Sequence, residues 1–196
     1  MQEIDSALAD RFRRHVEDSI AAKQALLEEL GSCLEVARVL IEAYRSSKML
    51  FLFGNGGSAA DAQHIAAEFL GRFYLERPAI AAHALTVNTS ALTAISNDYS
   101  FETVFSRQLE ALAKPGDVAV GISTSGNAAN VIRALRSGRE RGLVTVALTG
   151  AGGGRARLEA DFWVGVPSHD TARIQECHIM IGHIWSALVE SALYDG

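Results

Sequence analysis

Five short apolar runs alternate with segments of helical pattern from Lys48 onward, and glycine, proline or aspartate lies close to the ends of each run. The runs cover residues 49–53, 80–85, 118–122, 144–148 and 162–166. Such runs are typical of strands that are buried on both faces, and strands that alternate with helices form parallel sheets. We therefore predict an α/β fold with a doubly wound, five-stranded parallel sheet.

Helical patterns fill the intervals between these strands and both ends of the chain. They cover residues 58–70, 101–113, 127–141, a short stretch near Arg155 and residues 171–193. The first 46 residues contain no proline and one glycine, Gly31, and they place apolar residues such as Ile20 and Leu27 at helical spacing. We expect one domain, with two helices over residues 1–46, an α/β core over residues 47–196 and a long C-terminal helix.

Two loops of small and hydroxyl residues each follow a predicted strand and precede a predicted helix. The first loop is residues 54–58, Gly-Asn-Gly-Gly-Ser, and the second loop is residues 123–127, Ser-Thr-Ser-Gly-Asn. Each alone is also typical of an ordinary turn or helix cap. Small residues let backbone N–H groups approach phosphate oxygens, and a helix start adds its positive dipole end. Together, beyond the carboxyl ends of strands, the loops predict a site for a sugar phosphate.

The composition argues against several other classes of protein. A formal net charge of −5 offers no basic surface for a nucleic acid. No apolar run approaches the roughly 18 residues that cross a bilayer, and the first ten residues are polar and acidic, unlike a secretory signal. Cys33 and Cys177 lack metal-type spacing, so we expect two reduced thiols. We expect a cytoplasmic protein.

A dinucleotide-binding enzyme is an alternative, because Gly54, Gly56 and Ala59 satisfy the G-x-G-x-x-A fingerprint. That fingerprint needs an acidic residue near the end of the second strand to bind the ribose hydroxyls. The second predicted strand ends in Leu-Thr-Val-Asn, residues 85–88, without an acid. This interpretation therefore has little support.

The helix predicted after the first loop carries a polar stripe on an otherwise apolar surface. Asp61, His64 and Glu68 lie at positions i, i+3 and i+7. His64 and Glu68, four residues apart, can share one metal ion or one proton path, although a solvated helix face is the plainer interpretation. The C-terminal helix places Gln175 and His183 two turns apart among apolar residues. We interpret the remaining histidines as structural: His15, His83, His169 and His178.

Taken together, these segments resemble one known family. Phe-Gly-Asn-Gly-Gly-Ser, His64-x-x-x-Glu68, Asn97-Asp98, Ser-Thr-Ser-Gly-Asn and Arg-Ile-Gln-Glu followed by His183 occur in this order. Over essentially its whole length the chain is similar to the phosphoheptose isomerases of the sugar isomerase (SIS) domain superfamily, whose fold is flavodoxin-like. The resemblance implies a homotetramer that converts D-sedoheptulose 7-phosphate to D-glycero-D-manno-heptose 7-phosphate, the first step toward the heptoses of lipopolysaccharide or capsule.

The resemblance also implies the residues of the site. Substrate contacts fall on Asn55, Gly56, Gly57, Asn97, Asp98, Ser123, Thr124, Ser125 and Gln175, and Ser58 of the first loop is a further candidate. A zinc site, with one Zn²⁺ per subunit, falls on His64, Glu68, Gln175 and His183. Members of the family usually have serine after Ser-Gly-Asn, whereas this chain has Ala128, so one hydroxyl of the expected phosphate site is missing.

The chemistry of an aldose–ketose isomerase assigns roles to these groups. Moving a proton between C1 and C2 through a cis-enediol requires a base at carbon and an acid or metal at the oxygens. Glu68 is the candidate base, His183 the candidate partner of the sugar oxygens, and Asp61 can orient His64 or Gln175. Metal binding would lower the basicity of Glu68, so its role as base or as ligand stays open. Spacing alone does not distinguish zinc from other borderline divalent ions.

Two other functions remain as alternatives. Related SIS proteins without enzymatic activity bind the bacterial replication initiator or sense sugar phosphates. The initiator-binding relatives lack the acid and the histidine that this chain has at Glu68 and His183. An isomerase that acts on a pentose or hexose phosphate is the second alternative, because the sequence does not count the carbons of a substrate.

Helix geometry limits how Gln175 and His183 can act together. Eight residues on one helix separate their Cα atoms by about 12 Å along the axis and roughly 80° around it. One ion can scarcely bind both side chains of the same helix. We therefore expect a site at a subunit interface, where the two ligands come from different chains, or a site in which only one of them coordinates.

Overall fold

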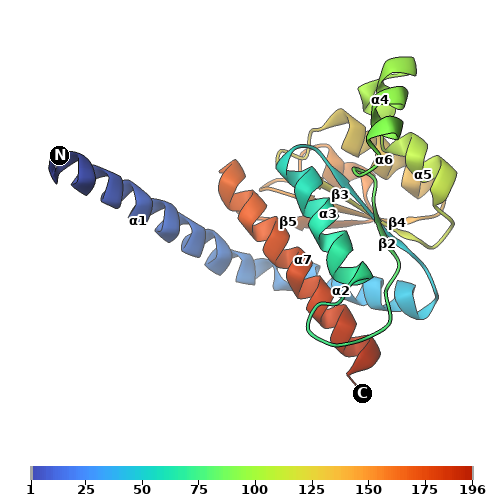
Figure 1. Cartoon of the computed structure of the whole chain (residues 1–196), viewed down its shortest axis with the longest axis horizontal. Coiled ribbons are helices and arrows are strands. Elements are labelled where there is room, and N and C mark those ends of the chain that lie inside the picture. Colours follow the sequence, from blue (N-terminus) through green and yellow to red (C-terminus); the bar gives the residue numbers. More distant parts are fainter. Residues whose placement is uncertain (1, 196) are drawn as a thin grey trace.

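A computed structural model describes residues 2–195 of the chain (Figure 1). Its sheet contains five parallel strands in the order β2-β1-β3-β4-β5. The strands are β1 (Leu50–Gly54), β2 (Ala82–Ala84), β3 (Val118–Ser123), β4 (Val144–Thr149) and β5 (Phe162–Gly165). The order confirms the predicted flavodoxin-like sheet, in which the chain changes direction between β1 and β3.

Helices cover both faces of this sheet. They are α1 (Gln2–Ala25), α2 (Leu30–Arg45), α3 (Gly57–Leu70), α4 (Thr89–Asp98), α5 (Ser106–Leu112), α6 (Ala129–Glu140) and α7 (Thr171–Tyr194). Leu50 and Leu52 of β1 pack in one apolar core with α2, α3 and α7, whereas Phe51 and Phe53 pack in a second core with α5 and α6. Alternate residues of one strand therefore face different helix layers, as a doubly wound sheet requires.

The N-terminal helices confirm the expected pair, joined by the 3₁₀ turn η1 (Leu26–Glu29). Much of α1 extends away from the sheet and its helices (Figure 1). Leu8, Phe12, Val16 and Ile20, spaced by four residues along α1, are all exposed. An isolated chain thus leaves an apolar helical stripe in water, although apolar surface is normally buried.

Three local differences from the sequence-based expectations have physical causes. The sequence did not reveal α4, which has no buried residue and contains several Ser and Thr residues of modest helix propensity. The helix expected over residues 101–113 is divided into the 3₁₀ turn η2 (Phe101–Thr103) and α5. The stretch near Arg155 forms the 3₁₀ turn η3 (Ala156–Glu159). Among the described residues, no helix is sufficiently long and apolar to cross a membrane.

Candidate active site

The first loop depends on two glycines for its path from β1 into α3. A Cβ at Gly54 would lie 2.8 Å from the carbonyl oxygen of Ile122 and from Cβ of Ser58, so only glycine fits there. Gly56 has a φ of 55°, in the left-handed region that favours glycine. These two residues turn the backbone directly into the start of α3 at Gly57.

Asn55 joins the first loop to the helix that follows the second. Its Nδ2 donates to Oδ1 of Asn130 at 2.8 Å, and Nδ2 of Asn130 donates to Oδ1 of Asn55 at 2.9 Å. The side-chain oxygen of Asn55 therefore accepts a hydrogen bond that links the first loop to α6, and its second amide hydrogen remains for a ligand. Asn130, three residues beyond the second loop on α6, is a positioning partner that the sequence did not indicate.

The second loop packs on the glycine-rich loop that follows β4. Gly126 has a φ of 65°, and a Cβ there would overlap the carbonyl group of Gly153. The backbone N–H of Ala156 donates to the carbonyl of Gly126 at 2.8 Å, and Gly150 donates to Thr124 at 3.0 Å. No side chain caps α6 at its N-cap residue, Ala128. The N–H of Val131 donates to Oδ1 of Asn130 at 2.9 Å, so the N–H groups of Ala129 and Asn130 remain at this helix start for an anion.

A small cavity of about 180 Å³ opens beside the second loop. Its lining combines loops after β3, β4 and β5 with the start of α7, and consists of Thr124, Ser125, Ala151, Ser168, His169, Thr171 and Ile174. The sequence analysis interpreted His169 as structural, and the structure places it in the lining of this cavity. His169 lies in the loop after β5, so its place beyond the carboxyl end of a strand was the available signal.

Three side chains from α3 and α7 converge on one another. Nε2 of His64 lies 2.9 Å from Oε1 of Glu68, and Nε2 of His183 lies 3.2 Å from Nε2 of His64. Nε2 of His183 is 4.0 Å from Oε1 of Glu68. We call these three residues the His–Glu–His cluster. His64 and Glu68 are four residues apart in sequence, and the fold places beside them His183, which the family resemblance also implies as a ligand.

Close packing of α3 on α7 brings the cluster together. A Cβ at Gly182 would overlap the side chain of Ile65, so glycine lets the two helices approach where His183 must reach His64. Gln175, two turns earlier on α7, lies instead beside the first loop, where a Cβ at Gly57 would be 2.9 Å from its Cδ. The same two helices thus carry the cluster and one wall of the first loop.

The geometry of the cluster fits a metal ion. Its three donor atoms lie within 4.8 Å of one another. A tetrahedral zinc ion holds its ligands at about 2.0–2.1 Å, which separates neighbouring ligand atoms by about 3.3 Å. Two imidazole nitrogens and one carboxylate oxygen suit Zn²⁺ or a similar divalent ion and leave a fourth position for another ligand.

Two groups of predicted site residues are not members of the His–Glu–His cluster. Asp61 is half-buried, with Oδ2 enclosed and without a hydrogen-bond partner among the described residues. Burial raises the pKa of Asp61 to about 6, and the neighbouring His64 opposes part of this rise. Asn97 and Asp98 end α4, where Nδ2 of Asn97 donates to Oδ1 of Asp98 at 2.9 Å. Their roles stay predictions.

Comparisons with known proteins show which family the chain is similar to. Residues 12–150 match the SIS domain family. A phosphoheptose isomerase from Aneurinibacillus thermoaerophilus is 52% identical over 188 residues, covering 94% of this chain and 95% of that protein. The solved structure of phosphoheptose isomerase from Neisseria gonorrhoeae is 45% identical, has a TM-score of 0.89, and is matched over 94% of this chain and 99% of that one. The chain belongs to the phosphoheptose isomerase family.

Membership in the phosphoheptose isomerase family makes the chain an isomerase with the SIS fold. A solved phosphoheptose isomerase from Francisella tularensis, only 30% identical, still superposes with a TM-score of 0.90 over 93% of this chain and 98% of that one. The fold of the family is therefore kept while much of the sequence varies.

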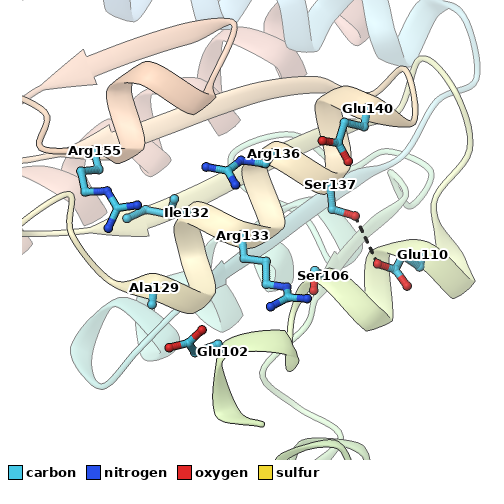
Figure 2. A pocket seen from close by; sticks show the side chains of 10 residues that line it. All are labelled: Glu102, Ser106, Glu110, Ala129, Ile132, Arg133, Arg136, Ser137, Glu140 and Arg155. Carbon is cyan, nitrogen blue, oxygen red and sulfur yellow. Dashed lines mark hydrogen bonds between the residues drawn. The ribbon is translucent and has the colours of Figure 1, made fainter. Parts of the chain in front are cut away.

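A larger hollow of about 550 Å³ lies on the other face of the sheet, along α6 and α5 (Figure 2). Three arginines line it, Arg133, Arg136 and Arg155, and three glutamates, Glu102, Glu110 and Glu140, balance their charge. None of the residues implied by the phosphoheptose isomerase family lines this hollow. Its size alone does not make it the active site, because the convergent donor groups lie elsewhere.

Proposed function

We propose that this chain interconverts D-sedoheptulose 7-phosphate and D-glycero-D-manno-heptose 7-phosphate. The observation that carries this proposal is the His–Glu–His cluster. It lies on the same two helices as Gly57, at the end of the first loop, and Gln175, which packs against Gly57. The base, the metal ligands and the end of the first loop are thus carried by two helices that cover the same face of the sheet. The names of the relatives support the sugar phosphate as substrate.

The phosphate end of the substrate is assigned to the second loop. Ser123, Thr124 and Ser125 supply hydroxyl and backbone donors, and the uncapped start of α6 adds further N–H groups. The remaining assigned contacts bind the sugar hydroxyls or the first carbons of the chain. They are Asn55, Gly56, Gly57, Ser58, Asn97, Asp98 and Gln175.

The proton transfer is assigned to Glu68 and His183. Glu68 takes the proton from one of the two reacting carbons and returns it to the other, through a cis-enediol. His183 exchanges protons with the adjacent sugar oxygens and assists ring opening. Their side chains are 22% and 37% exposed, so both are accessible from outside the protein.

The proposed cofactor is one Zn²⁺ per subunit, held by the His–Glu–His cluster and by Gln175. A bound divalent ion would polarise the sugar oxygens as a Lewis acid. Gln175 lies against Gly57 in its own chain, and the cluster holds His183 of that chain. Because Gln175 lies more than two turns from His183 on the same helix, the fourth ligand is assigned to Gln175 of a neighbouring subunit.

The proposed assembly is a homotetramer with active sites at subunit interfaces. The exposed apolar stripe on α1 supports this assembly, because residues 1–46 would bury it against other copies. Both cysteines are free, which suits the reducing cytoplasm. There the product would enter the synthesis of heptoses for lipopolysaccharide or capsule.

The deciding experiment follows the sugar directly. The protein is incubated with sedoheptulose 7-phosphate, and NMR detects the C1 proton of the aldose product. Parallel samples with pentose and hexose ketose phosphates test the specificity for seven carbons. Saturable binding without turnover would contradict the proposal and favour a sugar-phosphate-binding module, while faster turnover of a shorter sugar would favour a different aldose–ketose isomerase.

A further inference from the structure

The segment between α3 and β2, residues 71–81, contains no helix or strand, yet a buried ion pair holds it. Nε of Arg77, in this segment, lies 2.9 Å from Oε1 of Glu190, near the end of α7. The two side chains are only 1% and 2% exposed. Charged side chains are rarely so deeply buried unless they are paired and fully hydrogen-bonded.

Glu190 holds the first half of the segment through its backbone. Oε1 accepts from the N–H of Phe73 at 3.1 Å, while Oε2 accepts from Tyr74 at 2.6 Å and from Leu75 at 2.9 Å. Burial alone would raise the pKa of Glu190, but these N–H groups and Arg77 bring it below its usual value. The carboxylate is thus charged and fixes three successive residues.

Arg77 holds the end of the helix that carries two members of the His–Glu–His cluster. Its Nη1 donates to the carbonyl of Phe69 at 2.8 Å, and its Nη2 donates to the carbonyl of Glu68 at 2.8 Å. The last carbonyls of a helix have no partners within the helix, and a guanidinium satisfies them well. Arg77 therefore bonds directly to the backbone of Glu68.

Phe73, which Glu190 holds through its N–H, contacts the third member of the cluster, His183. Its ring stacks on the ring of His183, with centroids 5.6 Å apart and an angle of 26° between the planes. His183 and Glu190 are seven residues apart on α7, which places them on the same face of the helix. The side chain of Glu190 thus positions, through the N–H of Phe73, the ring that packs on His183.

We propose that Arg77 and Glu190 are positioning residues of the His–Glu–His cluster, acting on Glu68 through its carbonyl and on His183 through the ring of Phe73. The inference rests on the proposed function for the statement that the cluster binds a metal ion. The contacts of Arg77 and Glu190 do not depend on that function. Neighbours that orient metal ligands commonly change metal affinity or activity by 10- to 100-fold when they are altered.

Stability alone does not account for this ion pair. Burying two charges removes them from water, and well-packed apolar residues in place of such a pair often stabilise a protein as much or more. Glu190 bonds to the N–H groups of Phe73 and of the two residues that follow it. Arg77 bonds to the last carbonyls of α3 and to the carbonyls of Gly71 and Pro78. The burial of the ion pair and its choice of partners are both explained if the pair fixes the positions of the end of α3 and of Phe73.

The first test needs no metal. The full-length protein is treated with a chelator, and NMR records the ring protons of His183 in wild type, Phe73→Leu and Glu190→Gln. Loss of the Phe73 ring changes the shift of His183, and we expect Glu190→Gln to move it in the same direction. The matched control is Asp117→Asn, a buried carboxylate that accepts from the N–H groups of Met49 and Lys114 elsewhere in the fold.

Unchanged His183 signals in Glu190→Gln, or an equal change in Asp117→Asn, would overturn the inference. Should Glu190→Gln not fold, Arg77→Lys takes its place, because lysine keeps the charge but loses the forked bonds to the helix carbonyls. This NMR measurement is made without zinc, so its outcome can be distinguished from a failure of the proposed function.

The second test measures zinc affinity by competition with a coloured chelator. We expect Phe73→Leu and Glu190→Gln to weaken zinc binding by 10- to 100-fold, and kcat to fall while KM changes less than about twofold. Asp117→Asn is expected to lower Tm without changing zinc affinity. Wild-type zinc affinity in both Phe73→Leu and Glu190→Gln would refute the positioning role, whereas no zinc binding by wild type would refute the proposed metal site instead.

Discussion

The side-chain amide of Gln175 lies against the backbone of Gly57, at the point where the first loop becomes α3. A methyl group at Gly57 would come within 2.9 Å of Cδ of Gln175. Because Gln175 can change rotamer, this contact fixes the position of the amide more than it stabilises the fold.

We therefore expect Gly57→Ala to displace Gln175 and to raise KM by about tenfold, the effect of about 1.4 kcal/mol, with little change in Tm. A double-mutant cycle tests the cause. If the methyl group acts through Gln175, adding Gly57→Ala to Gln175→Ala should cost nothing more. Full additivity of the two effects would show that the methyl group acts elsewhere.

Glu68→Gln and His183→Gln should each lower kcat by at least about 100-fold, as expected for groups that transfer protons. Both changes keep the size of the side chain close to the original, so Tm and the circular dichroism spectrum should change little. Glu140→Gln, on the exposed surface of α6, is the matched control. Wild-type turnover in either site variant would remove that residue from the proposed mechanism.

Removal of the metal should abolish activity. Two imidazoles and one carboxylate bind borderline divalent ions reversibly, so dialysis against a strong chelator is expected to empty the site and added Zn²⁺ to restore turnover. Metal content measured by mass spectrometry accompanies each assay. Full activity in a sample shown to be free of metal would rule out a catalytic ion.

Ala128→Ser should improve two separate properties. Ala128 is the N-cap residue of α6 and provides no side-chain cap, so a serine hydroxyl should raise stability by about 1 kcal/mol without any ligand. If the hydroxyl also contacts phosphate, KM should fall by an amount worth up to about 1 kcal/mol. Asn127 is already bonded to Ser125 and Arg155. A higher Tm with an unchanged KM would separate capping from phosphate binding.

His178 should make the protein less stable in acid. This histidine is fully buried on α7, and burial lowers its pKa from 6.5 to about 4, an effect that the backbone of Thr149 only partly offsets. Between these values the unfolded chain binds a proton that the folded chain does not, so stability falls as the pH falls from 6.5 to 4.

Denaturant titrations at pH 7 and pH 4.5 should show that wild type loses on the order of 2 kcal/mol more than His178→Leu over this interval. Other titrating groups are common to both proteins, so the difference between them isolates His178. Equal losses in the two proteins would show that the histidine is protonated in the folded state.

Local patterns in the sequence predicted most of the framework. The strands, the two loops and the pair of His64 and Glu68 depend on neighbours within a few residues, where side-chain period and glycine content carry the information. The helix α4 escaped prediction because none of its ten residues is fully buried and only Leu92 and Ile95 pack partly against the core, which leaves a weak apolar periodicity.

The relationships that complete the site depend on residues far apart in the chain. His183 reaches His64 across 119 positions, Asn55 reaches Asn130 across 75, and Arg77 reaches Glu190 across 113. Each arises because the sheet order places particular helix faces together and because Gly182 lets α3 and α7 approach. The sequence by itself determined the strands, the loops and the family resemblance, since these are local patterns. Only the tertiary structure decided which distant side chains converge, because packing rather than chain proximity sets those contacts.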